Sequence, residues 1–227
     1  MKIGILGTGI VGKTIAAKLI ELGHEVTLGT RDVAGKLAET APDFYGNPPF
    51  NVWHAQHQQI KLATFTEAAA HGELVFNATN GGATLEALKS AQETNLNGKV
   101  LIDIANPLDF SHGMPPTLLV CNTDSLGEQI QRAFPLARVV KTLNTISAPV
   151  MVNPRQLAGG EHTMFVCGND AGAKTQVNEI LQDWFGWKYV IDLGDISVAR
   201  GMEMYLPLWL RLMGALGSPM INVKVVK

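Results

Sequence analysis

Residues 2–31 read KIGILGTGIVGKTIAAKLIELGHEVTLGTR, and this stretch determines the fold we expect. It opens with a short apolar run, residues 3–6, of the kind that forms a buried parallel strand. A glycine-rich turn follows, and behind it apolar residues recur at helical spacing before a second strand at 25–28. Strand, glycine turn, helix and strand in this order predict a dinucleotide-binding βαβ unit.

The turn has the spacing GxGxxG, and each of its glycines has a separate task. Gly7 permits the tight turn off the strand, Gly9 lets the backbone approach a pyrophosphate, and Gly12 lets helix and strand pack closely. The helix N-terminus offers free N–H groups and a positive dipole end to the phosphates. The residues expected to bind or shape this pyrophosphate loop are Gly7, Thr8, Gly9, Ile10, Val11 and Gly12.

The end of the second strand indicates which dinucleotide is bound. An NAD site usually has Asp or Glu there to hold the ribose 2′-hydroxyl. Here Thr30 takes that position with Arg31 beside it, and a hydroxyl with a guanidinium fork matches a phosphate. Asp32 would be the NAD acid if the strand ran longer, but Gly29 indicates an early strand end. The sequence therefore favours NADP, and Lys36 is either a further 2′-phosphate contact or a surface lysine.

The composition fits one large α/β domain, or one domain with a small appendage. The chain has 227 residues, 46% of them hydrophobic, and a formal net charge of -2 gives no reason to expect nucleic acid or an acidic membrane as partner. Because the first strand begins at the N-terminus, we expect no signal peptide and a cytoplasmic protein. Cys121 and Cys167 are too few for a disulfide framework and are expected to be small buried residues.

Beyond residue 31 the chain alternates helices and strands, apart from an irregular insertion expected at 41–59. His54 and His57 in that insertion have the side chains of metal ligands, but no carboxylate or cysteine completes a site, so no metal site is predicted. Strands are expected at 60–63, 73–76, 100–104, 138–143, 163–167, 189–192 and 221–226, and helices at 33–40, 64–70, 83–91, 125–134, 170–184 and 195–216, with a loop at 110–116.

This order predicts an α/β protein with a Rossmann-type, doubly wound, mostly parallel sheet and a small C-terminal α/β extension. The NADP-binding domain is expected over 1–146, and 147–227 would pack on it, forming the acceptor cleft and a dimer contact. The segment 195–216 is apolar nearly all round. Glu203, Pro207 and Arg211 interrupt it, which favours a helix in a core or a subunit interface over a membrane span.

Three loops directly follow predicted strands of this sheet. Ligands of doubly wound sheets bind at the carboxyl ends of the strands, so these loops should border the cofactor. The cofactor-binding residues expected from them are Ala78, Thr79, Asn80, Ala105, Asn106 and Asn144, with Thr145 also on the reaction side.

The glycine turn, together with LGHEV at 22–26 and GTR at 29–31, resembles the NADPH-dependent reductases of the deazaflavin coenzyme F420. The same module occurs in the cytoplasmic part of STEAP metalloreductases. The resemblance continues through KTLNTI at 141–146 to LPL at 206–208. It implies an NADP-binding Rossmann domain, a small C-terminal part and usually a homodimer. It also implies hydride transfer between the nicotinamide and a flavin-like ring in the cleft between the two parts.

No catalytic residue is assigned. Reduction of a carbonyl needs a positioned Lys, His or Tyr as proton donor, whereas Lys141 lies in a predicted strand and His112 in a loop without a visible partner. A deazaflavin takes up hydride at carbon, so the protein contributes mainly binding, orientation and exclusion of water.

The acceptor itself stays open. Members of the family have a Pro and an aromatic residue near Thr79 and Asn80, and a His in place of Asn144. A deazaflavin, a flavin, a quinone-like molecule or another small acceptor is compatible with these differences. Two further functions remain: an NADP-dependent dehydrogenase of a small hydroxy acid or imine, with Lys141 or His112 as proton donor, and a non-catalytic NADP(H) sensor.

Overall fold

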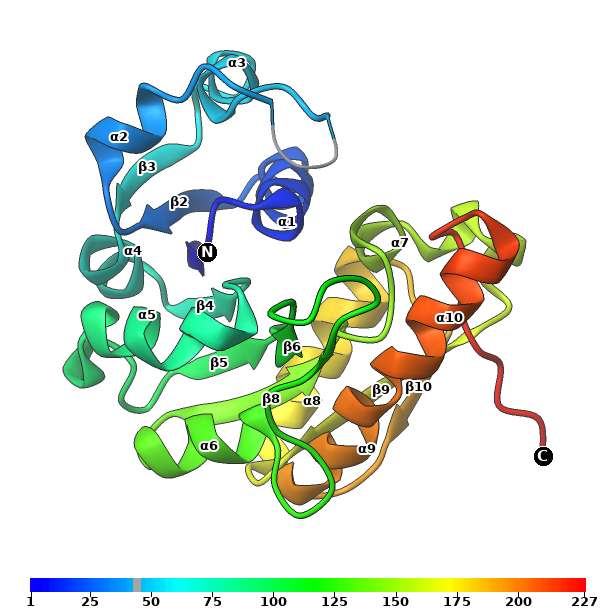
Figure 1. The fold of residues 1–227 in the computed structure, drawn as a ribbon. Coiled ribbons are helices and arrows are strands. Elements are labelled where there is room, and N and C mark those ends of the chain that lie inside the picture. Colours follow the sequence, from blue (N-terminus) through cyan, green and yellow to red (C-terminus); the bar gives the residue numbers. More distant parts are fainter. Residues whose placement is uncertain (43–45) are drawn as a thin grey trace.

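A computed structural model describes residues 1–42 and 46–227, and its main feature is one sheet of eight strands (Figure 1). The order is β10-β9-β8-β5-β4-β1-β2-β3, and every neighbouring pair is parallel except β8 and β9. The strands are β1 (Lys2–Leu6), β2 (Glu25–Thr30), β3 (Lys61–Thr64), β4 (Leu74–Asn77), β5 (Val100–Asp103), β8 (Arg138–Thr142), β9 (Thr163–Gly168) and β10 (Tyr189–Asp192). The expected mostly parallel, Rossmann-type sheet is confirmed.

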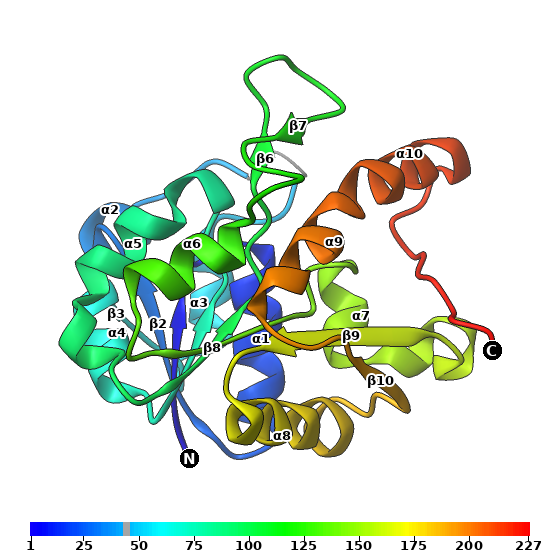
Figure 2. The same ribbon diagram turned by 90° about the horizontal axis from the view of Figure 1, so that it is seen from below.

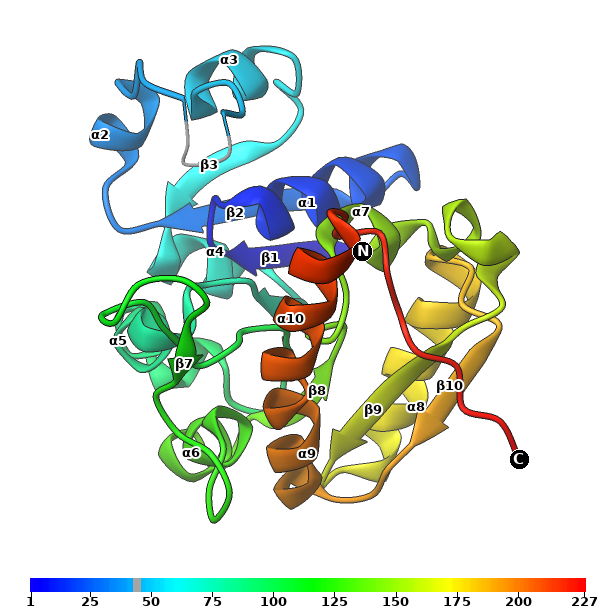
Figure 3. The same cartoon turned by 45° about the vertical axis from the view of Figure 1, so that its right-hand side comes forward.

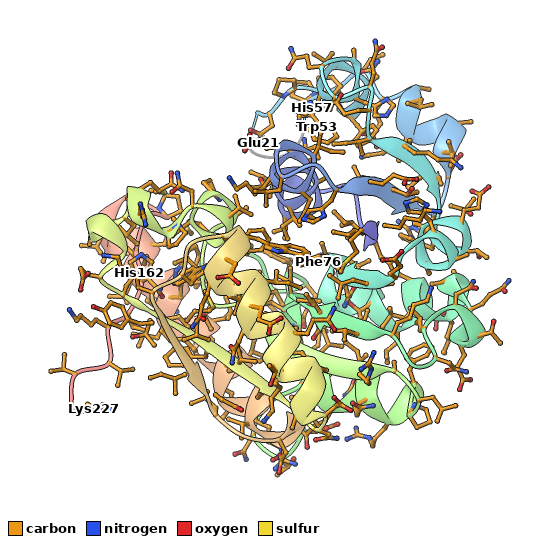
Figure 4. All side chains as sticks on the ribbon, turned by 180° about the vertical axis from the view of Figure 1, so that it is seen from behind. Glu21, Trp53, His57, Phe76, His162 and Lys227 are labelled. Atoms are coloured by element: carbon orange, nitrogen blue, oxygen red, sulfur yellow. The ribbon has the colours of Figure 1, made fainter. Side chains whose placement is uncertain are left out.

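Helices cover both faces of the sheet (Figures 1 and 2). One buried core includes α1 (Ile10–Glu21), α7 (Ala148–Val152) and α8 (Ala171–Glu179). The other includes α4 (Phe65–His71), α5 (Thr84–Ala91), α6 (Leu126–Ala133) and α9 (Ala199–Met204). The remaining helices are α2 (Val33–Leu37), α3 (Phe50–Ala55) and α10 (Leu206–Leu216). Side chains alternate along each strand between the two cores, which explains why residues 74–76 of β4 and 100–102 of β5 are all apolar. Phe76 of β4, for example, is fully buried (Figure 4).

The sheet continues across the expected domain boundary at residue 146. The antiparallel pairing of β8 with β9 joins β9 and β10 to the same sheet, and α9 and α10 follow one another past the end of β8 (Figure 3). A division into 1–146 and 147–227 therefore stays a prediction.

Gly29 does not end the second strand, so the predicted early end at residue 28 is wrong. β2 runs on to Thr30. A Cβ atom at Gly29 would lie 3.0 Å from side-chain atoms of both Phe65 and Ala68, so this glycine makes room for α4 against the strand.

The segment 41–59 is not wholly irregular, because it contains α3; residues 43–45 lie outside the described residues. Phe50 of α3 is 2% exposed. Trp53 stacks on His57 with ring centroids 4.3 Å apart (Figure 4). Both histidines bond to backbone carbonyls, His54 Nε2 to Ile60 at 2.8 Å and His57 Nδ1 to Trp53 at 2.8 Å. Their role in the structure is to hold α3 and the turn that follows it.

Several other elements differ from expectation in extent. The helix predicted at 33–40 ends at Leu37, and a short hairpin, β6 (Leu108–Asp109) with β7 (Thr117–Leu118), flanks the expected loop. The helix predicted at 170–184 changes at Ile180 to a π-helical turn. The segment 195–216 divides into a 3-10 turn, α9 and α10, with Pro207 in the first turn of α10.

The C-terminal segment and one of the two cysteines also differ from the prediction. No strand forms at 221–226, although Thr163 N donates to Val223 O at 2.9 Å and Val225 N donates to the Thr163 hydroxyl at 3.1 Å. Cys121 is exposed, and only Cys167 is buried as expected. Within the described ranges, no helix has the length and apolar character needed to cross a membrane.

Candidate cofactor site

The glycine turn packs closely against the loop after β4 and against the first turn of α1. Gly7 has φ +116°, and a Cβ there would lie 2.4 Å from the carbonyl oxygen of Ala78. A Cβ at Gly12 would lie 2.1 Å from the carbonyl oxygen of Gly7. Only glycine allows the turn and the first turn of α1 to approach each other and the loop after β4 so closely.

Gly9 differs from these two glycines, because a Cβ there would meet no protein atom within 4 Å. Gly9 is also the N-cap of α1, which has no side-chain cap bond and no acidic residue in its first turn. The free N–H groups of that turn therefore face open space. The expected close approach of a pyrophosphate fits this arrangement.

Three of the predicted groups of residues line one pocket of about 300 Å³, a volume at the lower end for small-molecule sites. It lies between the glycine turn, the end of β2, the loop after β4 and helix α5. Of the predicted cofactor residues it contains Gly7, Thr8, Gly9, Thr30, Arg31, Ala78, Thr79 and Asn80, and it adds Phe65, Ala83, Glu86, Ala87 and Ser90. Ile10, Val11 and Gly12 form the adjoining first turn of α1.

The acidic rival for the ribose contact has another role. The Asp32 side chain accepts a hydrogen bond from Gly35 N at 2.9 Å and caps α2. Thr30 and Arg31 line the pocket, whereas Asp32 does not. Lys36 lines a neighbouring pocket of about 650 Å³ that reaches Thr8 and Gly9. Its ammonium pairs with Glu39 at 2.7 Å, so a phosphate would compete with that carboxylate.

The loop after β4 is held by its own polar side chains. Thr79 Oγ1 donates to Asn77 Oδ1 at 2.7 Å and lies 2.8 Å from Thr84 Oγ1. The Asn80 side chain accepts a hydrogen bond from Gly82 N at 3.0 Å. These bonds fix the loop at the carboxyl end of the strand, where a ligand of this fold would lie.

The predicted residues from the loops after β5 and β8 lie next to this loop, outside the pocket. A Cβ at Gly81 would be 2.0 Å from the carbonyl oxygen of Asn106, so the loops after β4 and β5 touch. Asn106 and Asn144 bond to each other, with Asn106 Nδ2 donating to Asn144 O at 2.8 Å and Asn144 Nδ2 donating to Asn106 Oδ1 at 3.0 Å. Ala105 and Asn144 are buried. Ala105, Asn106 and Asn144 thus form one edge beyond Thr79 and Asn80.

Lys141 is unsuited to donate a proton to a substrate. Its side chain is fully buried, with the ammonium 2.7 Å from Asp103 Oδ2 and 2.9 Å from Glu203 Oε1. Burial alone would lower the pKa of Lys141, but the Asp103 and Glu203 carboxylates outweigh burial and hold that pKa above its ordinary value. His112 is exposed in the hairpin connection. Neither residue is placed as the general acid of a carbonyl reduction.

The pairing of Asp103, Lys141 and Glu203 was missed at the sequence level. A signal existed, since Lys141 and Glu203 each interrupt an apolar segment and buried charges are normally paired. That signal does not say which partners meet. Within the described residues, no three His, Cys, Asp or Glu side chains are grouped as metal ligands would be.

The comparisons with known proteins agree with this fold. Residues 2–107 match the family described as NADP oxidoreductase, coenzyme F420-dependent. A crystal structure of a protein from Arthrobacter sp. FB24, assigned as a candidate F420-dependent NADP-reductase, is 57% identical, superposes with a TM-score of 0.96 and is covered over 100% of both chains.

Two relatives with lower sequence identity also match most of this chain. The F420-dependent NADP reductase of Methanothermobacter marburgensis is 28% identical over 93% of this chain and 92% of its own. The metalloreductase STEAP3 of Rattus norvegicus is 28% identical over 92% of this chain, which spans only 38% of that protein's length.

A doubly wound sheet whose first strand leads into an open glycine turn and a helix N-terminus is typical of a dinucleotide-binding α/β protein. The chain belongs to the family described as NADP oxidoreductase, coenzyme F420-dependent.

Proposed function

We propose that this protein binds NADPH along the glycine turn and passes its hydride to a deazaflavin or flavin-like acceptor beside Asn106 and Asn144. The observation that carries the cofactor half is the open space at Gly9 next to a pocket lined by Thr30 and Arg31. In this proposal Arg31 and Thr30 bind the 2′-phosphate, and Lys36 adds a weaker contact because Glu39 already pairs with it.

The remaining predicted residues would orient the two rings. Bound NADPH supplies a hydride from its dihydronicotinamide. The loop held by Thr79, and the edge formed by Ala105, Asn106 and Asn144, would position that ring and keep water away from it. Hydride transfer to a deazaflavin would form the new bond at carbon and spread the charge over the ring, and a ring nitrogen would take up the balancing proton from solvent. No buried general acid is then needed, which agrees with the burial of Lys141 and the exposure of His112.

Oxidation of NADPH by the purified protein tests the proposal. Coenzyme F420, FMN and a reaction without acceptor run in parallel, with NADH as the control cofactor, and the absorbance of the reduced nicotinamide is followed. Rapid turnover with F420 and NADPH is expected. Turnover only with an imine or hydroxy-acid couple would identify a dehydrogenase instead, and tight NADPH binding without turnover on any acceptor would identify a sensor.

Arg31→Ala tests the phosphate contact directly. Loss of a charged hydrogen-bonded partner is expected to raise the Kd for NADPH by roughly tenfold or more, while the Kd for NADH changes by less than about twofold. Lys36→Ala should have a smaller effect on NADPH, because Glu39 already neutralises Lys36. Fluorescence titration measures all four affinities. Equal losses for NADPH and NADH would remove Arg31 from the 2′-phosphate site.

We further propose that the protein works in the cytoplasm as a homodimer. Both cysteines are free thiols, which suits a reducing compartment. The helix α10 and the β6–β7 hairpin carry exposed apolar side chains, which suit a subunit contact.

A further inference from the structure

The edge formed by Asn106 and Asn144 is tied to helix α9 by a neutral hydrogen bond. Asn144 is 2% exposed, and its Nδ2 donates to Met202 O at 3.2 Å as well as to Asn106 Oδ1 at 3.0 Å. Asn106 Nδ2 returns a bond to Asn144 O at 2.8 Å. The loop after β5, the end of β8 and α9 therefore share one buried amide group.

A second link between the same three segments is charged. The Lys141 ammonium is 2.9 Å from Glu203, the residue that follows Met202 on α9. It also donates to the carbonyl of Ala105, the residue before Asn106, and pairs with Asp103 at 2.7 Å. All three charged side chains are buried, with exposures of 0% for Lys141 and Asp103 and 1% for Glu203.

The two links close a polar ring, which we define as Ala105, Asn106, Lys141, Asn144, Met202 and Glu203. Met202 and Glu203 are adjacent on α9, and Ala105 and Asn106 are adjacent in the loop after β5. A shift or rotation of α9 against the sheet would therefore break both the neutral and the charged link. Asp103 extends the ring toward the cofactor, since its Oδ1 accepts from Asn77 Nδ2 at 2.7 Å. Asn77 in turn holds Thr79.

The ring and Asp103 together carry an excess negative charge, and the N-terminus of α6 partly offsets it. Two carboxylates face one ammonium, and Glu203 also accepts hydrogen bonds from Leu126 N at 2.8 Å and Gly127 N at 3.0 Å. These are the first N–H groups of α6, whose positive dipole end favours a carboxylate. Glu203 thus fixes α9 against α6 as well as against β8.

Such a group of buried charges is a poor means of gaining stability. Desolvation of the three charges offsets much of their attraction, and apolar side chains of similar volume often serve stability equally well. What the buried charges do provide is one defined geometry, since unpaired alternatives are costly. The ring joins residues proposed to orient the nicotinamide to the C-terminal helix α9.

We propose that Lys141 is a positioning residue: it locks α9 to the loops that carry Thr79 and Asn106 and thereby fixes the place of the hydride acceptor relative to the nicotinamide. The catalytic consequence rests on the proposed function. The position of α9 itself can be measured without any acceptor, so failure of one proposal is distinguishable from failure of the other.

Hydrogen exchange followed by mass spectrometry is the first test, on the full chain. Glu203→Gln keeps the side-chain shape but removes the charge that Lys141 faces. The matched control is Glu161→Gln, which removes the partner of Lys188 in an exposed ion pair at 3.0 Å. In Glu203→Gln, amides at 144–148 and 199–204 are expected to exchange about tenfold faster, while those of β1 and α1 keep their rates. The control should match the parent protein.

Kinetics with NADPH and coenzyme F420 form the second test. In Glu203→Gln the Kd for NADPH is expected to stay within about twofold, while kcat/KM for F420 falls by roughly ten- to a hundredfold, since a misplacement of about 1 Å can cost that much. A uniform rise in exchange, a parallel loss of NADPH binding, or unchanged exchange and kinetics would each show that the ring has no positioning role.

A neutral variant covers the case in which a single substitution unfolds the protein. Asp103→Asn, Lys141→Met and Glu203→Gln together remove all three charges and leave no unpaired ion. If this triple variant folds and still shows fast local exchange at 199–204, the charges set the position of α9. If its exchange pattern and its F420 kinetics match the parent protein, the proposal is overturned.

Discussion

Gly9 and Gly12 lie three residues apart in one turn, and the packing of the protein requires a glycine only at Gly12. At Gly12 the space is taken by protein, because a Cβ would sit 2.1 Å from the carbonyl of Gly7. At Gly9 the space is open and φ is -72°, so the protein itself would admit a side chain, which would obstruct the proposed pyrophosphate. A pattern such as GxGxxG combines these two requirements, and substitution can separate them.

Gly9→Ala and Gly12→Ala should therefore have opposite profiles. Gly12→Ala is expected to lower the free energy of unfolding by about 1–3 kcal/mol, because backbone must move to admit the methyl group. Gly9→Ala should change that free energy by less than about 1 kcal/mol but raise the Kd for NADPH by roughly tenfold. Urea unfolding and fluorescence titration measure the two quantities. Normal NADPH binding by Gly9→Ala would mean that the pyrophosphate lies elsewhere.

The two thiols should differ sharply in reactivity. Burial raises the pKa of Cys167 to about 12, and its side chain is shielded from reagents. Cys121 is exposed. A thiol reagent such as DTNB is expected to label one cysteine per folded chain and both after unfolding. Cys121→Ser should abolish the labelling of the folded protein, and rapid labelling of that variant would show that the Cys167 region opens readily.

At the scale of elements, hydrophobic periodicity correctly predicted individual strands and helices. It failed where segments that are distant in the sequence pack against each other. β1, β4 and β5 were found within a residue of the expected bounds, because the interior of a buried parallel strand is apolar. Gly29 was misread as a strand end, since its small size serves contact with α4 from another part of the chain. The chain end fails to form a strand because its bonds to Thr163 involve side chains and a single carbonyl.

The candidate site follows the same rule. Residues directly after a strand were predictable, because parallel strands bring their carboxyl ends to one edge. The pocket collects many of them, although their contact with NADP stays a prediction. The polar ring was not predictable, since Glu203 reaches Lys141 only through the packing of α9 on α6 and β8.

The helix α6 provides a test of pH dependence at this scale. Two hydrogen bonds from Arg132, at 2.9 and 2.7 Å, lower the pKa of Asp124, just before the helix, to about 2. A carboxyl whose pKa is lower in the folded state stabilises that state above its unfolded pKa of 3.8, and loses this contribution as the pH falls toward 2.

Asp124→Asn is therefore expected to cost about 1 kcal/mol at neutral pH, a modest value because Arg132 is largely exposed and screened by solvent. The difference from the parent protein should shrink below pH 4 and vanish near the folded pKa of about 2. Urea unfolding across this range measures it. A difference that stays constant with pH would rule out the ion pair as its cause.

At the scale of the whole molecule, the carboxyl edge of the sheet carries nearly all the features discussed. The glycine turn, the pocket and the polar ring lie there, and so does the hairpin that follows β5 and projects beside α10 (Figure 2). Met114 and Pro115 of the hairpin connection share a pocket of about 420 Å³ with Leu210, Met213 and other residues of α10. The turns that connect α1, α4 and α6 to the next strand lie at the opposite edge.

The same edge exposes large apolar side chains, which a soluble monomer normally covers. Those on the hairpin segment and α10 are Phe110, Met114, Leu119, Leu208 and Leu216, with exposures of 47, 61, 53, 56 and 63%. If two copies cover this surface, a charge placed within it must be desolvated without a partner. Leu208→Glu is therefore expected to shift the protein from twice the 24.4 kDa chain mass to a single chain, with its unfolding midpoint little changed.

The control is Leu136→Glu, at 61% exposure just before β8 and thus at the opposite edge of the sheet. It should keep the dimeric mass, because the new charge stays in solvent. Sedimentation velocity over a range of concentrations measures both variants. A parent protein that sediments as a single chain, or dissociation by Leu136→Glu but not by Leu208→Glu, would move the subunit contact away from α10 and the hairpin.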